Sequence, residues 1–178
     1  SRVLKLIEAE CQRAEAGEDA RVVAKINNLS DPVIIRALYR ASSRGVKIDL
    51  LVRTICCLRP GVAGLSDNIR VFSTIGRFLE HSRVYYFAGG GDEQVYCASA
   101  DWMPRNLYRR VEVAWPLNNP ALRGRVRREA LEFQLEDNCQ LWELGPDGQW
   151  TRRQPEGALP HSAQQRLLEE LGDGASAS

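Results

Sequence analysis

The pattern that decides the fold runs over residues 20–52, ARVVAKINNLSDPVIIRALYRASSRGVKIDLLV. Its first part, residues 20–26, is a compact Val-rich run that ends at two asparagines and predicts a buried strand. Asp31, which precedes a proline, predicts the start of a helix, and Gly45 predicts its end. Residues 46–52 predict a second buried strand. A helix between two buried strands indicates a right-handed parallel crossover, so we expect an α/β fold.

The rest of the chain extends this pattern in both directions. We expect strands at 69–75, 82–87, 95–98 and 111–115, helices at 2–16, 120–138 and 163–171, and a small hairpin between 141 and 150. The Gly89-Gly90-Gly91-Asp92 segment predicts that the strands on either side of it form a hairpin. The expected organisation is a helix in 1–19, a main domain in 20–140, a hairpin and helix in 141–171, and a disordered tail in 172–178.

Composition indicates one globular domain. Of 178 residues, 44% are apolar, which is enough for a sizeable core. The 24 basic and 23 acidic residues leave a net charge of +1, so we expect neither nucleic acid nor a membrane surface as a partner. No apolar run is long enough to predict a transmembrane segment, and the N-terminus does not resemble a signal peptide. The first residue, Ser1, indicates a processed or excised piece.

The five cysteines predict a reducing compartment. They form no C-x-x-C pair and have no histidine at zinc spacing, so we expect free thiols and no metal site. The adjacent Cys56 and Cys57 are interpreted as small buried thiols, with a redox or metal feature as the alternative. These features together favour a cytoplasmic location.

Four residues at the ends of the predicted 82–87 and 95–98 strands carry groups suited to phosphoryl chemistry. His81 and Arg83 would share one face of the first strand, and Ser99 and Asp101 one face of the second. Pairing of these strands would bring the four side chains to one edge. Arginine offers a permanent cationic fork to phosphate oxygens, and histidine exchanges a proton near neutral pH or attacks phosphorus. The alternative is a structural histidine beside a surface Arg–Asp ion pair.

This pattern resembles the phospholipase D motif, H-x-K followed by a small residue, Ser, x and Asn on the next strand. The matching segments are His81-Ser82-Arg83 and Ala98-Ser99-Ala100-Asp101. Three positions depart from the motif, because Arg83 replaces Lys, Ala88 occupies the place of a downstream Asp, and Asp101 replaces Asn. A standard phosphodiesterase is therefore not expected.

A closer resemblance is to the second C-terminal domain of polyphosphate kinase, which implies a phospholipase D-like mixed sheet flanked by helices. It covers residues 3–140 and keeps the order and spacing of the family's motifs. The motifs are Lys25-Ile26-Asn27-Asn28-Leu29, Leu51-Val52-Arg53 with 56–61, Asp67-Asn68-Ile69-Arg70, Arg77-Phe78-Leu79-Glu80-His81-Ser82-Arg83, and Ser99-Ala100-Asp101-Trp102-Met103-Pro104-Arg105-Asn106.

The resemblance implies reversible transfer of the terminal phosphate of ATP to polyphosphate through a phosphohistidine, with Mg²⁺. The phosphorylated histidine and the magnesium ligands would belong to an upstream domain that is absent from this sequence. His81 would face the phosphohistidine and act in proton transfer or phosphate stabilisation. Arg53 would contact a nucleotide phosphate, and Arg110 a second phosphate. The implied partners are ATP or ADP, polyphosphate, the rest of the polypeptide and further copies in a homo-oligomer, with membrane association of the full-length protein left open.

Charge and motif position make Arg83 and Lys25 further phosphate candidates. Lys25 lies inside a predicted buried strand, so an anion must be near it, and that anion is either a carboxylate or a phosphate. Arg53 follows a predicted strand at its carboxyl end, where open α/β sheets bind ligands. For Arg110, the alternative to a phosphate contact is an ordinary ion pair with Glu112. We expect Trp102 to be a packing residue.

Three functions follow from these observations. The leading hypothesis is half of a kinase site, in which His81 and Arg53 converge on an anion-sized hollow that is open toward a partner domain. The second is a phosphodiesterase or nuclease in which two copies pair their His81 motifs. The third is a non-catalytic module that binds acidic polymers.

Overall fold

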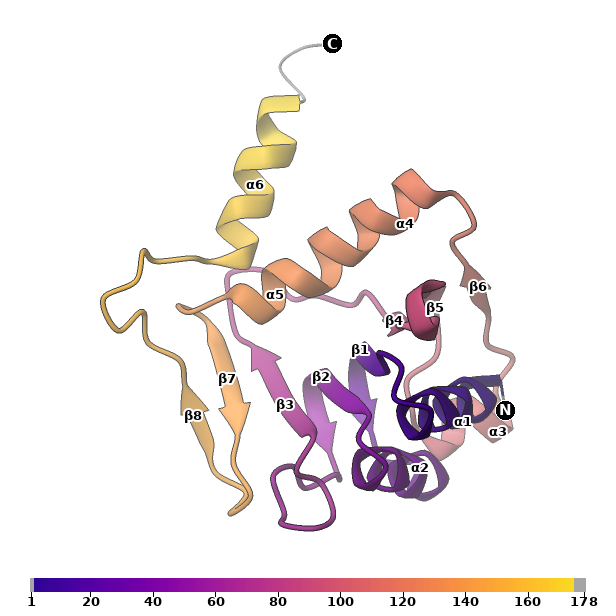
Figure 1. The fold of residues 1–178 in the computed structure, drawn as a ribbon. Coiled ribbons are helices and arrows are strands. Elements are labelled where there is room, and N and C mark those ends of the chain that lie inside the picture. The colour runs from indigo at the N-terminus through magenta and orange to yellow at the C-terminus, as the bar shows by residue number, and fades with distance from the viewer. Residues whose placement is uncertain (1, 175–178) are drawn as a thin grey trace.

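The computed structural model describes residues 2–174, and over this range the chain forms one eight-stranded sheet with helices on both faces (Figure 1). The strands lie in the order β6-β5-β4-β1-β2-β3-β7-β8. Their bounds are β1 (Arg21–Leu29), β2 (Lys47–Cys56), β3 (Ile69–Thr74), β4 (Val84–Phe87), β5 (Gln94–Ala98), β6 (Ala114–Pro116), β7 (Leu141–Leu144) and β8 (Trp150–Arg152). The α-helices are α1 (Arg2–Glu15), α2 (Pro32–Ser43), α3 (Pro104–Arg109), α4 (Pro120–Arg127), α5 (Phe133–Glu136) and α6 (Ala163–Gly174).

The β1-α2-β2 unit confirms the predicted parallel crossover. β1 and β2 pair in parallel, with Val22 opposite Ile48. The Asp31 carboxylate caps α2 by accepting hydrogen bonds from the backbone N–H groups of Val33 at 3.1 Å and Ile34 at 2.8 Å. The helix ends before Gly45, whose φ of 92° lies in the left-handed region, which glycine adopts at little energetic cost.

Side chains of the central strands alternate between the two faces of the sheet, and they divide the core into two layers. Val22 in β1 and Leu50 in β2 pack into the larger cluster, on the side of α1 and α2. Val23 and Leu51 point the other way, into a smaller cluster that includes Leu131 from the π-helical turn η2 (Arg128–Glu132) between α4 and α5. The sheet is thus a buried middle layer, as expected for parallel strands covered on both faces.

The sheet is mixed, which confirms the predicted fold class. β1, β2 and β3 are parallel, so their carboxyl ends meet at one edge. β4 and β5 form the predicted antiparallel hairpin, joined by a 3-10 turn, η1 (Gly89–Gly91). β7 pairs antiparallel with β3, so the C-terminal hairpin extends the same sheet.

Several predicted boundaries were wrong. The strand expected at 82–87 begins at Val84, so His81 and Arg83 lie outside it and do not share a strand face. The strand expected at 111–115 is β6, which includes Pro116; proline is tolerated there because β6 is an edge strand. The strand expected to end at residue 26 continues to Leu29.

The C-terminal end also differs from the prediction. α6 continues to Gly174, so residues 172–174 are helical where a disordered tail was expected. The rest of that predicted tail, 175–178, and the first residue of the predicted N-terminal helix lie outside the described residues. Between residues 2 and 174, none of the helices combines the length and hydrophobicity needed to cross a membrane.

Candidate phosphate-binding site

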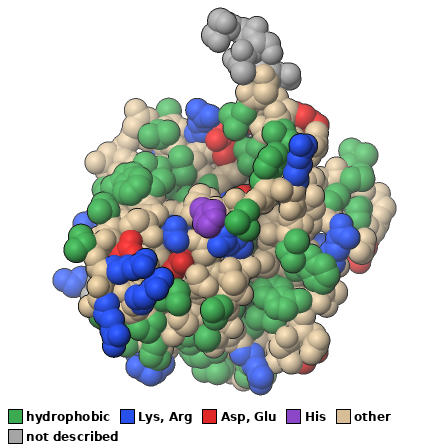
Figure 2. All heavy atoms as spheres, turned by 180° about the vertical axis from the view of Figure 1, so that it is seen from behind, with side chains coloured by type: hydrophobic (Ala, Val, Ile, Leu, Met, Phe, Trp, Pro, Cys, Tyr) green, Lys and Arg blue, Asp and Glu red, His purple; other side chains and the backbone are tan. Residues whose placement is uncertain are grey.

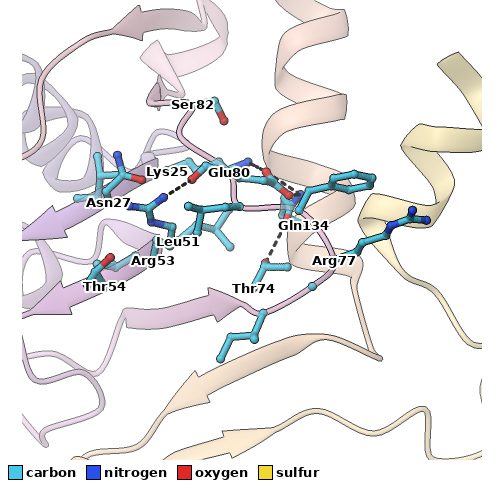
Figure 3. Close-up of a pocket in the computed structure, with 16 residues that line it drawn as sticks. Lys25, Asn27, Leu51, Arg53, Thr54, Thr74, Arg77, Glu80, Ser82 and Gln134 are labelled. Carbon is cyan, nitrogen blue, oxygen red and sulfur yellow. Dashed lines mark hydrogen bonds and ion pairs between the residues drawn. The ribbon is translucent and has the colours of Figure 1, made fainter.

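A cavity of about 390 Å³ lies at the carboxyl ends of the three parallel strands (Figure 3). Its floor comes from the ends of β1, β2 and β3, one wall from the 75–82 segment between β3 and β4, and another from α5. The polar side chains that line it are Lys25, Asn27, Arg53, Thr54, Thr74, Arg77, Glu80, Ser82 and Gln134. The edge where open α/β sheets bind ligands is therefore hollow and polar in this protein.

Alternation along the strands explains which side chains reach this cavity. Lys25 in β1 and Arg53 in β2 are an even number of residues from Val23 and Leu51, which face the α4–α5 side of the sheet. They project to that same side at the strand ends, where the apolar cluster stops. Two cations on neighbouring strands are thus placed beside one hollow.

Arg53 lines this cavity and contacts His81, which is not itself a lining residue. The Arg53 Nη1 atom lies 3.2 Å from His81 Nε2 and 3.4 Å from His81 Nδ1, and it also donates to the Glu80 carbonyl oxygen at 3.2 Å. The guanidinium is half-buried and the imidazole is exposed. In its neutral form the imidazole has one nitrogen free to accept from Arg53. Figure 2 shows a face of the molecule on which a histidine side chain lies among Lys and Arg side chains.

The anion beside Lys25 is a carboxylate. Lys25, which is 9% exposed, forms an ion pair with Glu80. The same carboxylate accepts hydrogen bonds from Gln134 Nε2 at 3.1 Å and Gln164 Nε2 at 2.9 Å. Burial alone would raise the pKa of Glu80, but the charge of Lys25 and these hydrogen bonds together hold that pKa below its ordinary value. Of the two anions that the sequence allowed, the structure shows the carboxylate.

Arg83 and Asp101 form a second ion pair, and it is largely buried. Arg83 Nε lies 2.9 Å from Asp101 Oδ1, and Asp101 is 3% exposed. Asp101 also accepts from the Asn27 backbone N–H at 2.8 Å and from Asn28 Nδ2 at 3.0 Å. Burial alone would raise the pKa of Asp101, but these donors lower it. The pair ties the end of β1 to the segment after β5.

The four residues expected at one edge are only partly brought together. Arg83 reaches Asp101, and its Nη1 atom donates to the His81 carbonyl oxygen at 3.2 Å. Ser99 instead bonds the Glu112 carboxylate and accepts from the Val113 N–H at 3.0 Å. The reason is that Ser99 follows the end of β5 and faces the segment leading into β6.

Arg110 is exposed at the end of α3 and does not line the cavity. Glu112 accepts hydrogen bonds from Ser99 and Asn106, which lower its pKa, and the charge of Arg110 lowers it further. The charge of Arg110 thus acts on Glu112, but these two described side chains do not form the ion pair that was the alternative to a phosphate role.

Sequence reasoning missed three residues of the site, Glu80, Gln134 and Gln164. Glu80 could have been predicted from the sequence, because it lies inside the motif that contains His81 and because Lys25 required an anion. The two glutamines could not have been predicted from a local pattern, since each is more than 50 residues from the loop that it contacts. Among residues 2–174, no three His, Cys, Asp or Glu side chains are grouped so that they could hold a metal ion.

The fold and this site define the class of the protein. A mixed sheet covered by helices, with a basic hollow at the ends of its parallel strands, is a phospholipase D-like α/β domain. Nuc from Salmonella typhimurium, a phospholipase D family member, shares this fold with a TM-score of 0.50 at 18% identity, over 74% of this chain and 85% of that one.

A more specific comparison identifies the family. The family model described as polyphosphate kinase C-terminal domain 2 matches residues 1–164, and the chain belongs to this family. It is 54% identical over 170 residues to a polyphosphate kinase of Xylella fastidiosa, a match that covers 95% of this chain and 24% of that protein. The polyphosphate kinase structure from Porphyromonas gingivalis matches with a TM-score of 0.92 at 39% identity, over 98% of this chain and 26% of that one.

Two consequences follow from these matches. The chain spans about a quarter of the length of these relatives. The family model also extends to residue 164, so the family pattern continues past residue 140, where the resemblance seen in the sequence ended. β7, β8 and the first two residues of α6 are therefore part of the family domain rather than an addition to it.

Proposed function

We propose that this domain supplies one half of the active site of an ATP–polyphosphate phosphotransferase. The reaction is the reversible transfer of the terminal phosphate of ATP to polyphosphate through a phosphohistidine in an upstream domain. The observation that carries the proposal is the contact of His81 with Arg53, which lines the cavity. Both side chains belong to motifs that resemble those of the family.

Arg53 is suited to a phosphate because its charge is not already neutralised. Within residues 2–174, no Asp or Glu side chain forms an ion pair with its guanidinium. Its Nη1 atom is held by a carbonyl oxygen and an imidazole, neither of which carries a negative charge. A guanidinium in this state attracts phosphate oxygens through charge-assisted hydrogen bonds.

His81 is suited to a role in the transfer step. Its ring is exposed beside the guanidinium, so a phosphoryl group bound by Arg53 would lie within reach of the imidazole. Phosphoryl transfer depends mainly on positioning and on cations around the developing negative charge, and a histidine can also move a proton near neutral pH. We assign His81 to proton transfer or to stabilisation of the transferring group, opposite the phosphohistidine.

The other predicted site residues take supporting roles in this proposal. Arg83 and Asp101 fix the end of β1, and Ser99 fixes the segment that leads to β6. Lys25 adds positive charge at the cavity floor, reduced by its pairing with Glu80. Arg110 is proposed as a second phosphate contact for a ligand that extends beyond the cavity.

The remaining assignments rest on the family. They are ATP or ADP and polyphosphate as substrates, Mg²⁺ held by upstream residues, the rest of the polypeptide as partner, and assembly into homo-oligomers. A cytoplasmic location is supported by the five free cysteines. The His81 motif departs from the phospholipase D pattern at three positions, which disfavours an independent phosphodiesterase.

The test uses this chain alone and joined to the upstream part of the Xylella fastidiosa relative, each incubated with ATP and Mg²⁺. We expect acid-labile phosphohistidine and polyphosphate from the joined protein and neither from the chain alone. His81→Ala should abolish polyphosphate synthesis, whereas the matched change at the other histidine, His161→Ala, should not. Cleavage of phosphodiesters by the chain alone, lost in His81→Ala, would favour the phosphodiesterase instead, and binding of polyphosphate without any transfer would favour the non-catalytic module.

A further inference from the structure

The loop that presents His81 is clamped by a glutamine from the C-terminal helix. Gln164, in the first turn of α6, accepts from the Phe78 backbone N–H at 2.9 Å through Oε1 and donates to the Phe78 carbonyl oxygen at 2.8 Å through Nε2. The same Nε2 donates to Glu80 Oε1 at 2.9 Å. Gln164 is 6% exposed. Both Nε2 protons and the Oε1 acceptor of this amide are therefore used on the loop.

A second buried glutamine holds the same loop from the other side. Gln134 in α5 accepts from the Thr74 hydroxyl at 2.7 Å and donates to Glu80 at 3.1 Å (Figure 3). It is 1% exposed, so loss of these partners would leave a buried amide unsatisfied. Glu80 is thus fixed by Gln134, Gln164 and Lys25 together.

The loop backbone also lies directly against Gln164. A Cβ atom placed on Gly76 would be 2.4 Å from Gln164 Oε1 and 2.6 Å from Gln140 Oε1, so a larger residue here would have to displace both amides. Next to it, the Ile75 N–H donates to the Gln140 carbonyl oxygen at 3.0 Å. The loop is therefore held along its length, from residue 75 to residue 80.

The position of this loop sets the geometry of the phosphate site. The Glu80 carbonyl oxygen accepts from Arg53 Nη1, and His81 is the next residue, so a shift of Glu80 moves the imidazole relative to the guanidinium. The base of α6 can impose a fixed position because it is itself anchored. The Ala163 N–H donates to Asp137 Oδ2 at 2.8 Å, and the Arg166 guanidinium lies 3.7 Å from the centre of the Phe133 ring.

We infer that Gln164 is a positioning residue for His81 and Arg53, acting through the backbone of Phe78 and the side chain of Glu80. This inference rests on the proposed function of the site. Gln164 does not line the cavity itself but bonds two residues that do, Phe78 and Glu80, so its effect would be on the geometry of the transfer step. Displacements of about 1 Å at such a site reduce rates by about a hundredfold.

The test compares Gln164→Met with Gln165→Met. Methionine keeps the length of the side chain but removes the amide, and Gln165 is a matched control because it is exposed and its side chain donates only to Glu169 on the same helix. In this chain, Gln164→Met should speed hydrogen exchange at the Phe78 amide by about tenfold or more, because it removes the acceptor. It should also weaken binding of inorganic tripolyphosphate by about threefold to tenfold, and Gln165→Met should change neither quantity.

In the protein joined to the upstream part of the Xylella fastidiosa relative, Gln164→Met should lower kcat by about tenfold to a hundredfold, with a change in KM for ATP of less than about threefold. A merely structural role would lower the amount of folded protein without changing the kcat of the folded fraction. The inference is overturned if Phe78 exchange and kcat in Gln164→Met match those of Gln165→Met. Failure of the proposed function would appear separately, as absence of tripolyphosphate binding and transfer in the unmodified protein.

Discussion

Two groups of cations lie at the same edge of the sheet, and they differ in whether a carboxylate neutralises them. Lys25 and Arg83 form ion pairs with Glu80 and Asp101, and we call these four residues the closed half of the site. Arg53, together with His81, forms the open half, and no carboxylate of residues 2–174 is paired with it. The closed half is buried to a greater extent than the open half.

The difference shows how one strand edge both fixes geometry and binds an anion. A buried charge is stable only when it is paired, so the closed half cancels its own charge and serves as structure. Arg53 is half-buried and keeps contact with water, so its charge does not need a carboxylate. The positive charge available to a phosphate in this cavity is therefore that of Arg53, together with Arg77, which also lines the cavity and forms no ion pair with a carboxylate of residues 2–174. The following predictions test this division, in order of decreasing effect.

Disrupting the ion pairs of the closed half should lower the free energy of unfolding. Asp101→Ala removes a buried carboxylate that accepts from Arg83, the Asn27 N–H and Asn28, and it leaves these donors unpaired. We expect the free energy of unfolding to fall by about 3–5 kcal/mol, measured by urea denaturation. Asp101→Asn, which keeps an acceptor oxygen, should cost less. A loss below about 1 kcal/mol in Asp101→Ala would show that the pair is not a structural element.

Removing the charge of the open half should lower the affinity for phosphate and change the free energy of unfolding little. Arg53→Ala removes a charge-assisted hydrogen bond to phosphate, so we expect binding of inorganic tripolyphosphate to weaken about tenfold to a hundredfold in calorimetry. Arg36→Ala, at an exposed arginine on α2, is the matched control and should bind like the unmodified chain within about twofold. Equal affinity in the two variants would remove the assignment of Arg53.

The open half can be divided further by replacing His81. His81→Ala should weaken tripolyphosphate binding by less than about tenfold, because the guanidinium of Arg53, with its permanent charge, remains in place to bind phosphate oxygens. In the joined protein the same change should abolish phosphate transfer. The comparison of calorimetry with the transfer assay therefore separates ground-state binding by Arg53 from the chemistry assigned to His81. A larger loss of binding in His81→Ala than in Arg53→Ala would reverse these roles.

The smallest effect concerns the pH dependence of the closed half. The folded pKa of Glu80 is below its ordinary value of 4.5, so the unfolded chain binds a proton at higher pH than the folded chain. The stability that Glu80 contributes is therefore fully present above that value and is lost as pH falls through the lower, folded pKa. Glu80→Gln should be less stable by about 1 kcal/mol near neutral pH, and this difference should shrink in acid.

Denaturation of both proteins between about pH 3 and pH 7 measures this effect. A constant difference across that range would show that Glu80 does not titrate with folding. The result would also show whether Lys25 needs an ionised partner or only a hydrogen-bond acceptor.

Local signals in the sequence were sufficient for the central unit of the fold. The β1-α2-β2 crossover was predicted because burial, the Asp31 cap and the Gly45 stop are properties of neighbouring residues. Arg53 was predicted to follow a strand that ends at residue 52, but β2 continues to Cys56, so Arg53 lies inside the strand and lines the cavity from there. The family motifs added the pairing of Arg53 with His81, which the structure confirms.

The segment around His81 required tertiary structure. Alternation placed His81 and Arg83 on one strand face, but the strand begins at Val84. The residues before Val84 are outside the strand, and in this loop Gln134 bonds Glu80 while Gln164 bonds both Phe78 and Glu80. Nothing in a local pattern reports such contacts, which join residues more than 50 positions apart.

The sequence by itself determined the α/β class, the parallel crossover, and the residue types that suit a phosphate site. It also determined that Lys25 needs an anion, but only the tertiary structure decided that this anion is Glu80. The physical reason is that burial and alternation are set along the chain, whereas the partner of a buried charge is set by whichever distant group the packed fold brings within a few ångströms. The division into a closed and an open half is for that reason a property of the packed fold.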